Sequence, residues 1–184
     1  MRSGKQRIRH TIAGCALGRL LVAASERGIC ALYLGDSDAE LAGALRRDFP
    51  AAILERDDAG LAPWAGTIRR HLAGEPARLD LPLDLHGTPF QQRVWAGLRQ
   101  IPAGHTLSYG ELARRLGLPH TATRAVAAAC GANRVAILVP CHRVVGADGR
   151  LTGYRWGLDR KHRLLELERS AVGPGDVEDT DIGP

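Results

Sequence analysis

The chain has 184 residues, of which 45% are hydrophobic and 24% charged, proportions typical of a soluble globular protein with one compact unit or two small domains. No apolar run approaches the roughly 18 residues of a membrane span, and the basic N-terminus lacks the apolar segment of a signal peptide. This composition argues against an integral membrane protein and against a secreted one, so we expect a cytoplasmic location.

The net charge of +5 is unevenly distributed along the chain. Residues 1–86 are almost neutral, whereas residues 87–170 carry 13 Lys or Arg against 5 Asp or Glu. A local excess of +8 is typical of a polyanion binder, although a solvated basic face would give the same count. Residues 171–184 carry four acidic residues, three glycines and two prolines, and we expect this tail to be disordered.

The cysteines and histidines give no sign of a disulfide or a metal site. The four cysteines form no C-x-x-C pair and should be reduced thiols in the cytosol. The seven histidines are scattered, and none lies at metal-ligand spacing from a cysteine. We therefore expect neither a metal nor a cofactor.

The first half of the chain, residues 1–86, predicts a small α/β domain. Alternating apolar residues predict strands, and apolar residues at helical spacing predict helices. Glu26-Arg27-Gly28 suits a hairpin turn, and Asp36-Ser37-Asp38 offers N-caps for a helix that Pro50 should end. The other expected elements are strands over residues 7–14, 18–25 and 29–34, a helix over residues 61–72 and an extended segment over residues 79–85. No residue in this half suggests catalysis.

The second half predicts mostly helices, and His86-Gly87 is its expected boundary. Thr88-Pro89 combines an N-cap with a proline at the first helical position. The following helix should present its apolar side chains on one face: Phe90, Val94, Leu98 and Ile101.

A helix-turn-helix is expected next. Ser108 and Glu111 form a capping box at the start of a short helix, and Gly117-Leu118-Pro119 suits a turn. Thr121 can cap a second, alanine-rich helix that runs to about Cys130. A helix with so few bulky side chains can approach either a protein core or a DNA groove closely.

The segment from Val135 to Val145 is the one most suggestive of chemistry. Its apolar run ends at Pro140, and Cys141-His142-Arg143 follows at once. We expect residues 135–140 to be a buried extended segment that delivers Cys141. A thiol beside an imidazole and a guanidinium has surroundings that lower a cysteine pKa, although a structural cysteine would fit this short motif as well.

The remaining elements are a turn over residues 147–150, a loop over residues 153–157 and a last helix. We expect Asp159 to cap this helix. Its apolar face should bury Leu164, Leu165 and Leu167 and expose Arg160, Lys161 and Arg163.

Five segments together resemble a known family: Ser108–Ala113, Arg124–Asn133, Pro140–Val145, Gly153–Lys161 and Leu164–Glu168. In this order and spacing they resemble the O6-alkylguanine-DNA alkyltransferases, over roughly residues 7–169. The resemblance implies an α/β (α+β) protein. Residues 1–86 would form an RNase H-like domain with a small antiparallel sheet. Residues 87–170 would form a mostly helical, winged helix-turn-helix-like domain that binds DNA and holds the active site.

The resemblance also implies an activity. Members of the family flip a damaged nucleotide out of duplex DNA and transfer its alkyl group from guanine O6 to a cysteine. The implied reaction is irreversible, consumes one protein per lesion and includes O4-alkylthymine as a second substrate. The implied partner is double-stranded DNA containing O6-alkylguanine, bound through its minor groove by a monomer.

Five residues match the family's catalytic positions. Cys141 would accept the alkyl group, His142 would act as its base through a water, and Glu168 would orient His142. Tyr109 would help to rotate the nucleotide and donate a proton to the guanine ring. Asn133 would fix the turn between the recognition helix and Cys141.

Other matches concern DNA and the substrate pocket. Arg124 would fill the space that the flipped nucleotide leaves. Further DNA contacts are expected from Tyr109, Ala125, Ala128 and Arg134. The pocket would be formed by Tyr154, Arg155, Val144 and Val139, with the carbonyls of Cys141 and Val144 recognising the guanine amine.

Some points depart from the family pattern or stay open. One extra residue lies between Pro119 and Arg124, and Arg155 stands where some relatives carry serine. Glu166 competes with Glu168 for the carboxylate role. Two other classes also fit parts of the sequence: a DNA-binding regulator without chemistry, and a cysteine hydrolase with many turnovers.

Overall fold

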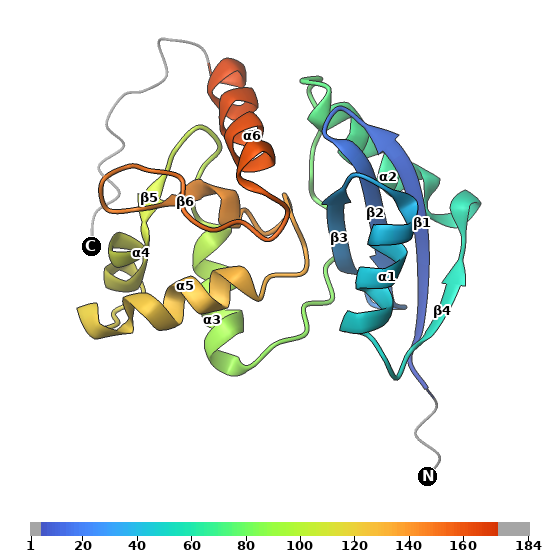
Figure 1. Ribbon diagram of the computed structural model, residues 1–184, viewed down its shortest axis with the longest axis horizontal. Helices are drawn as coiled ribbons and strands as arrows, with labels where there is room; N and C mark the ends of the chain where they lie inside the picture. Colours follow the sequence, from blue (N-terminus) through green and yellow to red (C-terminus); the bar gives the residue numbers. More distant parts are fainter. Residues whose placement is uncertain (1–4, 173–184) are drawn as a thin grey trace.

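A computed structural model describes residues 5–172, and Figure 1 shows two lobes joined by an irregular segment. The N-terminal lobe contains a four-stranded sheet in the order β3-β2-β1-β4. The strands β1 (Arg7–Cys15), β2 (Gly18–Ala24) and β3 (Ile29–Gly35) form the predicted antiparallel meander. The sequence reading missed β4 (Ile53–Arg56), which pairs in parallel with β1. This strand has only four residues and no alternation of buried and exposed positions, so it lacks the usual strand pattern.

Two helices pack on this sheet, as predicted. The first, α1 (Asp38–Asp48), begins where the Ser37 side chain accepts a hydrogen bond from the Glu40 amide. The second, α2 (Asp58–Leu72), begins three residues before the predicted start because Asp57 caps it through the Gly60 amide. The apolar faces of both helices are buried against the strands.

An irregular segment over residues 73–88 connects the lobes. It follows the edge of β3: the Ile29 amide donates to the Pro82 carbonyl at 2.8 Å, and the Asp84 amide donates to the Ile29 carbonyl at 2.9 Å. This agrees with the extended segment predicted over residues 79–85. The division into domains at residues 86 and 87 stays a prediction.

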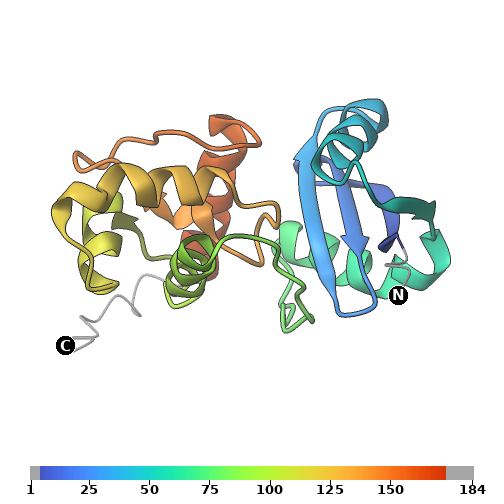
Figure 2. The same cartoon turned by 90° about the horizontal axis from the view of Figure 1, so that it is seen from below.

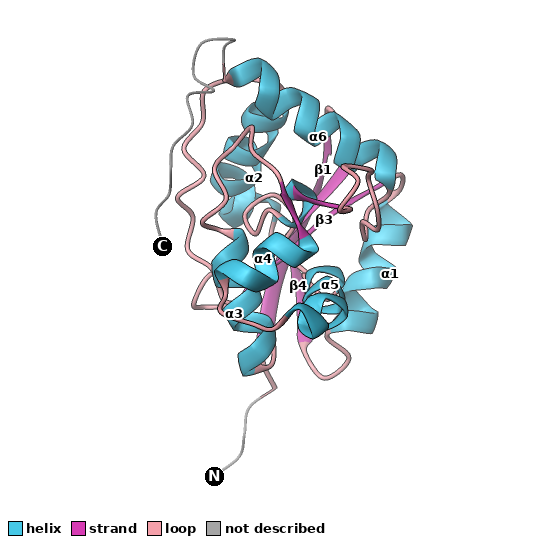
Figure 3. Ribbon diagram, turned by 90° about the vertical axis from the view of Figure 1, so that its left-hand side faces the viewer, coloured by secondary structure: helices cyan, strands magenta, loops and turns pink. Residues whose placement is uncertain are grey.

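The C-terminal lobe is mostly helical, and Figure 3 views it from the side of α3, α4 and α5. Capping boxes begin α3 at Thr88 and α4 at Ser108, the second as predicted. The elements are α3 (Pro89–Leu98), α4 (Tyr109–Arg115), α5 (Thr123–Gly131) and α6 (Leu158–Ala171), with the parallel strands β5 (Leu107–Ser108) and β6 (Val144–Val145).

The second helix of the helix-turn-helix begins later than predicted. A 3₁₀ turn, His120–Ala122, precedes α5, so Thr121 does not cap that helix. The residue before α5 is Ala122, which has helical backbone angles and no side-chain acceptor. The Thr123 hydroxyl instead donates to the His120 carbonyl at 2.7 Å. The residues directly before Arg124 thus form a tightened entry turn.

The apolar segment before Cys141 is buried as predicted, but it is not extended. Residues 135–139 form consecutive turns in which the Leu138 amide donates to Ala136 and the Val139 amide to Val135. Ile137 has a φ of 70°, a conformation that is strained for a β-branched residue. The side chain of Asn133 holds the turns by bonding the backbone of both Val135 and Val139. A short apolar run does not distinguish a buried strand from a buried turn.

The start of α6 also corrects two expectations. Gly157 occupies the cap position and Asp159 lies in the first turn, where it makes no capping bond. Lys161, which was expected outside, is fully buried. The disorder predicted for residues 171–184 lies, apart from the first two of them, outside the described residues.

The lobes contact each other through β3 and the start of α6. In Figures 1 and 2, β3 is the strand nearest the C-terminal lobe. The Leu32 amide donates to the Arg134 carbonyl at 2.9 Å, and the Ala136 amide donates to the Leu32 carbonyl at 3.0 Å. Arg160 binds Asp36 and the carbonyl of Leu17. No helix among residues 5–172 is long and apolar enough to cross a membrane.

Candidate active site

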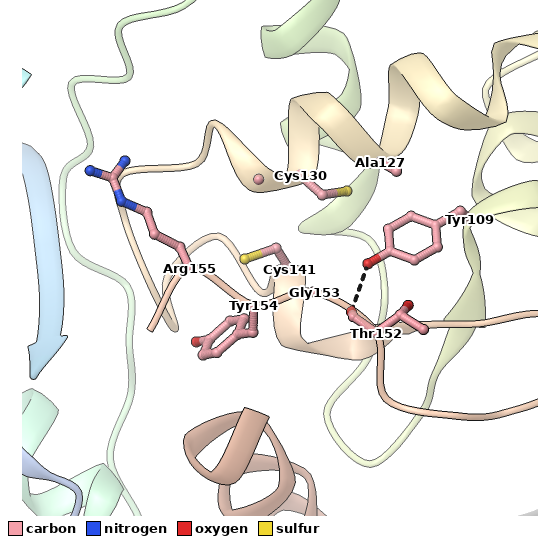
Figure 4. Close-up of a pocket in the computed structure, with 9 residues that line it drawn as sticks. Tyr109, Ala127, Cys130, Cys141, Thr152, Gly153, Tyr154 and Arg155 are labelled. Carbon is pink, nitrogen blue, oxygen red and sulfur yellow. Dashed lines mark hydrogen bonds between the residues drawn. The ribbon is translucent and has the colours of Figure 1, made fainter. Parts of the chain in front are cut away.

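Cys141 faces a cavity of about 280 Å³ in the C-terminal lobe (Figure 4). It begins a 3₁₀ turn, Cys141–Arg143, directly after the buried turns over residues 135–139. Its side chain is almost completely buried. The cavity lies between α4, α5 and the loop before α6, and its walls are Tyr109, Ala127, Cys130, Gly131, Thr152, Gly153, Tyr154 and Arg155.

The Cys141 thiol is held in its protonated form. Burial raises its pKa to about 11, although the Asn133 amide, 3.2 Å from Sγ, and the charge of Lys161 act in the opposite direction. The sequence-based expectation of a lowered cysteine pKa was therefore wrong for the free protein. The charge of Arg143 does not offset burial because its guanidinium faces Glu168, and the His142 imidazole faces Glu168 as well. A nucleophilic sulfur here requires a base.

His142 can supply that base. It is fully buried, and its Nε2 lies 2.7 Å from Oε1 of Glu168. Burial lowers the pKa of His142 against the effect of Glu168, so the imidazole is neutral at pH 7. Because Glu168 is ionised, Nε2 carries the hydrogen and Nδ1 is the proton acceptor. Within the described part of the chain, Nδ1 has no hydrogen-bond partner.

Glu168 is fixed from several sides. Burial alone would raise its pKa, but hydrogen bonds from His142 and Arg143 hold that pKa at about 2. The Arg143 guanidinium donates to both Glu168 oxygens and to the Ile101 carbonyl. The competing carboxylate, Glu166, is exposed and lies 3.4 Å from His162 on the outer face of α6. The geometry thus favours Glu168, as the sequence did.

Comparison with known proteins identifies the family to which both lobes are similar. Residues 8–85 match the ribonuclease-like domain of 6-O-methylguanine DNA methyltransferase, and residues 89–170 match its DNA binding domain. A crystal structure of Mycobacterium tuberculosis O6-methylguanine methyltransferase superposes with a TM-score of 0.75 at 38% identity, covering 92% of this chain and 96% of that one. The chain belongs to the 6-O-methylguanine DNA methyltransferase family.

Two further relatives show how much of each protein is shared. The inducible methylated-DNA–protein-cysteine methyltransferase of Bacillus subtilis is 46% identical over 132 residues, which are 72% of this chain and 73% of the relative. The Escherichia coli bifunctional transcriptional activator/DNA repair enzyme Ada is 52% identical over 161 residues. That match covers 88% of this chain but only 45% of Ada.

In this family member, the residues predicted for DNA lie in three places, and the first of them, Tyr109, lines the cavity with Cys141. Arg124, Ala125 and Ala128 are exposed together on α5. Arg134 lies elsewhere, with its guanidinium 5.3 Å from the Phe49 ring centre and 3.7 Å from Asp48 at the contact between the lobes. Because Arg134 has protein partners, we leave it out of the DNA surface proposed below.

Of the residues predicted for the pocket, some line the cavity and others do not. Tyr154 and Arg155 line the cavity as expected, although the Arg155 guanidinium extends away from Cys141 to bind Asp48 (Figure 4). Val139 and Val144 are fully buried and, contrary to expectation, are not wall residues. The Val139 carbonyl accepts from the Asn133 amide, and the Val144 carbonyl accepts from the Lys161 ammonium.

Sequence reasoning missed several residues of this site. Ala127, Cys130 and Gly131 follow one another at i, i+3 and i+4 along α5, so their helical spacing was the available signal. Lys161 lies behind the wall formed by Thr152 and Gly153. Only two lysines occur among 25 basic residues, and that rarity was a signal too. Among residues 5–172, no three His, Cys, Asp or Glu side chains converge as metal ligands would.

Proposed function

We propose that this chain repairs DNA by transferring the alkyl group of O6-alkylguanine, and of O4-alkylthymine, directly to Sγ of Cys141. The main support is the buried thiol of Cys141, which lines a cavity of about 280 Å³. The next residue, His142, pairs with Glu168, and among the described residues Nδ1 of His142 has no hydrogen-bond partner. The chain spans 45% of the length of the Ada proteins that it matches.

The proposed step is a displacement at carbon. His142 Nδ1 accepts the thiol proton through a bridging water, and the sulfur then attacks the alkyl carbon. The carbon–oxygen bond breaks, and its electron pair stays on guanine O6. The imidazolium that forms is stabilised by Glu168, which is ionised in advance and held by Arg143. The Asn133 amide stabilises the thiolate through its hydrogen bond to Sγ.

Tyr109 has the position of a proton donor to the departing guanine. Its hydroxyl reaches the cavity wall, where it donates to the Thr152 carbonyl at 3.1 Å. Burial raises the pKa of Tyr109, so the phenol keeps its proton. A thioether has no leaving group comparable with the guanine oxygen, so the sulfur keeps the alkyl group and each molecule acts once.

The proposed partner is duplex DNA. A protein monomer would bind the minor groove of this duplex through the exposed face of α5. One structure of the Mycobacterium tuberculosis relative, with a TM-score of 0.73 and 39% identity, is a complex with DNA. A thiol in a cavity reaches a base only if the nucleotide leaves the stack. Arg124, at the exposed start of α5, is proposed to fill the resulting gap.

The deciding experiment is intact-mass measurement after incubation with a duplex that contains O6-methylguanine or O4-methylthymine. One CH₂ unit per protein should be gained at Cys141, and the gain should stop at one equivalent. The matched control is Cys141→Ala, which should bind the duplex and gain nothing. Release of product without a mass change would favour a cysteine hydrolase. Binding without either result would favour a DNA-binding regulator.

A further inference from the structure

Lys161 is the most unusual charged residue of the C-terminal lobe. Its side chain is fully buried, and no Asp or Glu of residues 5–172 forms an ion pair with it. Burying an ammonium group without a compensating partner costs several kcal/mol in real proteins. A fold that keeps such a group must use all of its donors.

Three backbone carbonyls take the three donors of the ammonium. Nζ lies 2.5 Å from the oxygen of Val144, 2.9 Å from that of Thr152 and 3.3 Å from that of Gly153. An ammonium has three N–H donors, so this set satisfies it fully. The bonds join two separate segments of the chain.

Those segments are the two sides of the active site. Val144 follows the 3₁₀ turn that carries Cys141, whereas Thr152 and Gly153 form the opposite wall of the cavity (Figure 4). The Thr152 carbonyl also accepts the hydroxyl of Tyr109. One ammonium therefore connects the segment of the acceptor thiol, the cavity wall and the phenol proposed as proton donor.

The choice of lysine fits this geometry. Of the 25 basic residues, 23 are arginines. A guanidinium is a planar fork that suits carboxylates, whereas an ammonium is a compact centre whose donors point in three directions. Converging carbonyls from two segments match the ammonium. The other lysine, Lys5, is exposed and serves as a natural control.

The charge of Lys161 also acts on the thiol. It lowers the pKa of Cys141 against the effect of burial. In turn, negative charge on Cys141 or Cys130 would raise the pKa of Lys161, which burial lowers. The structure thus holds the Lys161 ammonium within electrostatic range of the Cys141 sulfur.

We propose that Lys161 is a positioning residue for alkyl transfer: it fixes the cavity wall and the Tyr109 hydroxyl relative to Cys141, and its charge favours the thiolate. This inference rests on the proposed function and adds a residue to it. A merely structural lysine would affect folding but leave the intrinsic reactivity of the folded protein unchanged.

The test compares Lys161→Met with Lys5→Met and wild type. Methionine keeps the length of the side chain but removes its charge and donors. With O6-methylguanine duplex, the saturating single-turnover rate constant of folded Lys161→Met should fall on the order of 100-fold, as expected when reacting groups are misplaced by about 1 Å. Binding of the duplex should be nearly unchanged, because Lys161 is remote from solvent. Lys5→Met should match wild type.

A second readout needs no DNA. Modification of Cys141 by iodoacetamide, followed by mass spectrometry across a pH series, reports the thiol pKa directly. In wild type the rate should rise until about pH 11. In Lys161→Met the midpoint should move to higher pH, while Lys5→Met should leave it in place. An unchanged profile together with a wild-type transfer rate in Lys161→Met would overturn the proposal.

If Lys161→Met does not fold, wild-type protein with ¹⁵N-labelled lysine side chains still provides a test. Only two ammonium signals exist, and the buried one should exchange slowly with water. S-methylation of Cys141 by methyl iodide should shift the Lys161 signal and leave that of Lys5 unchanged. A Lys161 signal that is insensitive to the thiol would contradict the inference. Failure of wild type to take a methyl from DNA would instead refute the proposed function, because both thiol readouts are independent of DNA.

Discussion

The two lobes differ in how deeply they bury their ion pairs. In the N-terminal lobe the side chains of Arg7 and Glu55 pair on the surface, where they are 64% and 39% exposed, and the buried Asp84 pairs with the exposed side chain of Arg27. In the C-terminal lobe the His142–Glu168 pair is 0% and 3% exposed. Surface pairs contribute little to stability, whereas a buried pair needs every partner in place. Among the described residues, the ion pair with the least exposed partners thus lies in the lobe that holds Cys141.

The largest expected effect is on that thiol itself. Cys141→Ala should abolish methyl transfer completely, because Cys141 is the proposed acceptor and directly precedes the proposed base, His142. The nearby wall residue Cys130 provides the contrast: Cys130→Ala should still accept one methyl equivalent at Cys141. Intact-mass analysis with peptide mapping checks both variants. Methyl transfer to Cys130 in the Cys141→Ala protein would break the assignment.

Glu168→Gln should slow transfer and destabilise the fold, because it removes the carboxylate that contacts both His142 and Arg143. Its rate constant for transfer should fall on the order of 100- to 10,000-fold, the range that general-base assistance contributes. Its free energy of unfolding should fall by about 3 kcal/mol, because Arg143 keeps a buried charge without its partner. The surface control, Glu55→Gln, should change both quantities little. Equal destabilisation of the two variants, measured by urea unfolding, would remove the contrast between the lobes.

The comparison of wild type with Glu168→Gln also predicts a pH dependence of stability. The pKa of Glu168 is about 2 in the folded protein, below its ordinary value of 4.5. A depressed carboxyl pKa contributes stability above the ordinary value and loses it as the pH falls towards the folded value. The stability advantage of wild type over Glu168→Gln should therefore shrink between about pH 4.5 and pH 2, as followed by thermal unfolding. An advantage that is constant over this window would mean that Glu168 is not ionised in the fold.

Arg124→Ala should separate nucleotide flipping from chemistry. Repair of duplex DNA should slow on the order of 100-fold, since unstacking costs a few kcal/mol that would go uncompensated. Reaction with free O6-methylguanine base should change much less, because nothing has to be unstacked. The two rate constants should be measured side by side in wild type and variant. Equal losses would mean that Arg124 supports the fold or the cavity instead.

The smallest expected effects concern the charge difference between the lobes. Arg114→Ala on α4 should weaken duplex binding modestly and reduce the slope of log affinity against log salt by about 1. Arg46→Ala on α1, equally exposed, should leave the slope unchanged. Fluorescence anisotropy with a labelled duplex at several salt concentrations measures both. Matching slopes for the two variants would mean that the N-terminal lobe contacts DNA as well.

The sequence predicted those features that depend on local rules. The capping box at Ser108 and the helical spacing of apolar residues required only neighbours within one or two turns. The resemblance predicted Cys141 as the acceptor thiol, His142 as its base and Glu168 as the carboxylate that orients His142, and the structure has His142 and Glu168 in contact. The conformation of residues 135–139 could not be read in this way, because it depends on Asn133 and on the edge of β3.

Lys161 illustrates the other limit of sequence reasoning. A lysine between an arginine and a histidine near a helix start reads as a solvated residue. Its burial depends on three carbonyls from segments 8 to 17 residues away. Likewise, the raised pKa of Cys141 follows from the depth of the cavity, which no pattern of neighbouring charges indicates.

The hydrogen bonds between Leu32 and residues 134–136 have a consequence for solubility. The strand β3 lies at one end of the sheet, and all seven of its residues are buried. An uncovered apolar edge strand is a template for intermolecular β-pairing. Here the turn that leads to the reactive cysteine covers that edge, together with the segment around Pro82. Separating the two lobes would therefore expose an aggregation-prone surface in one of them at the same moment as it dismantled the reactive centre of the other.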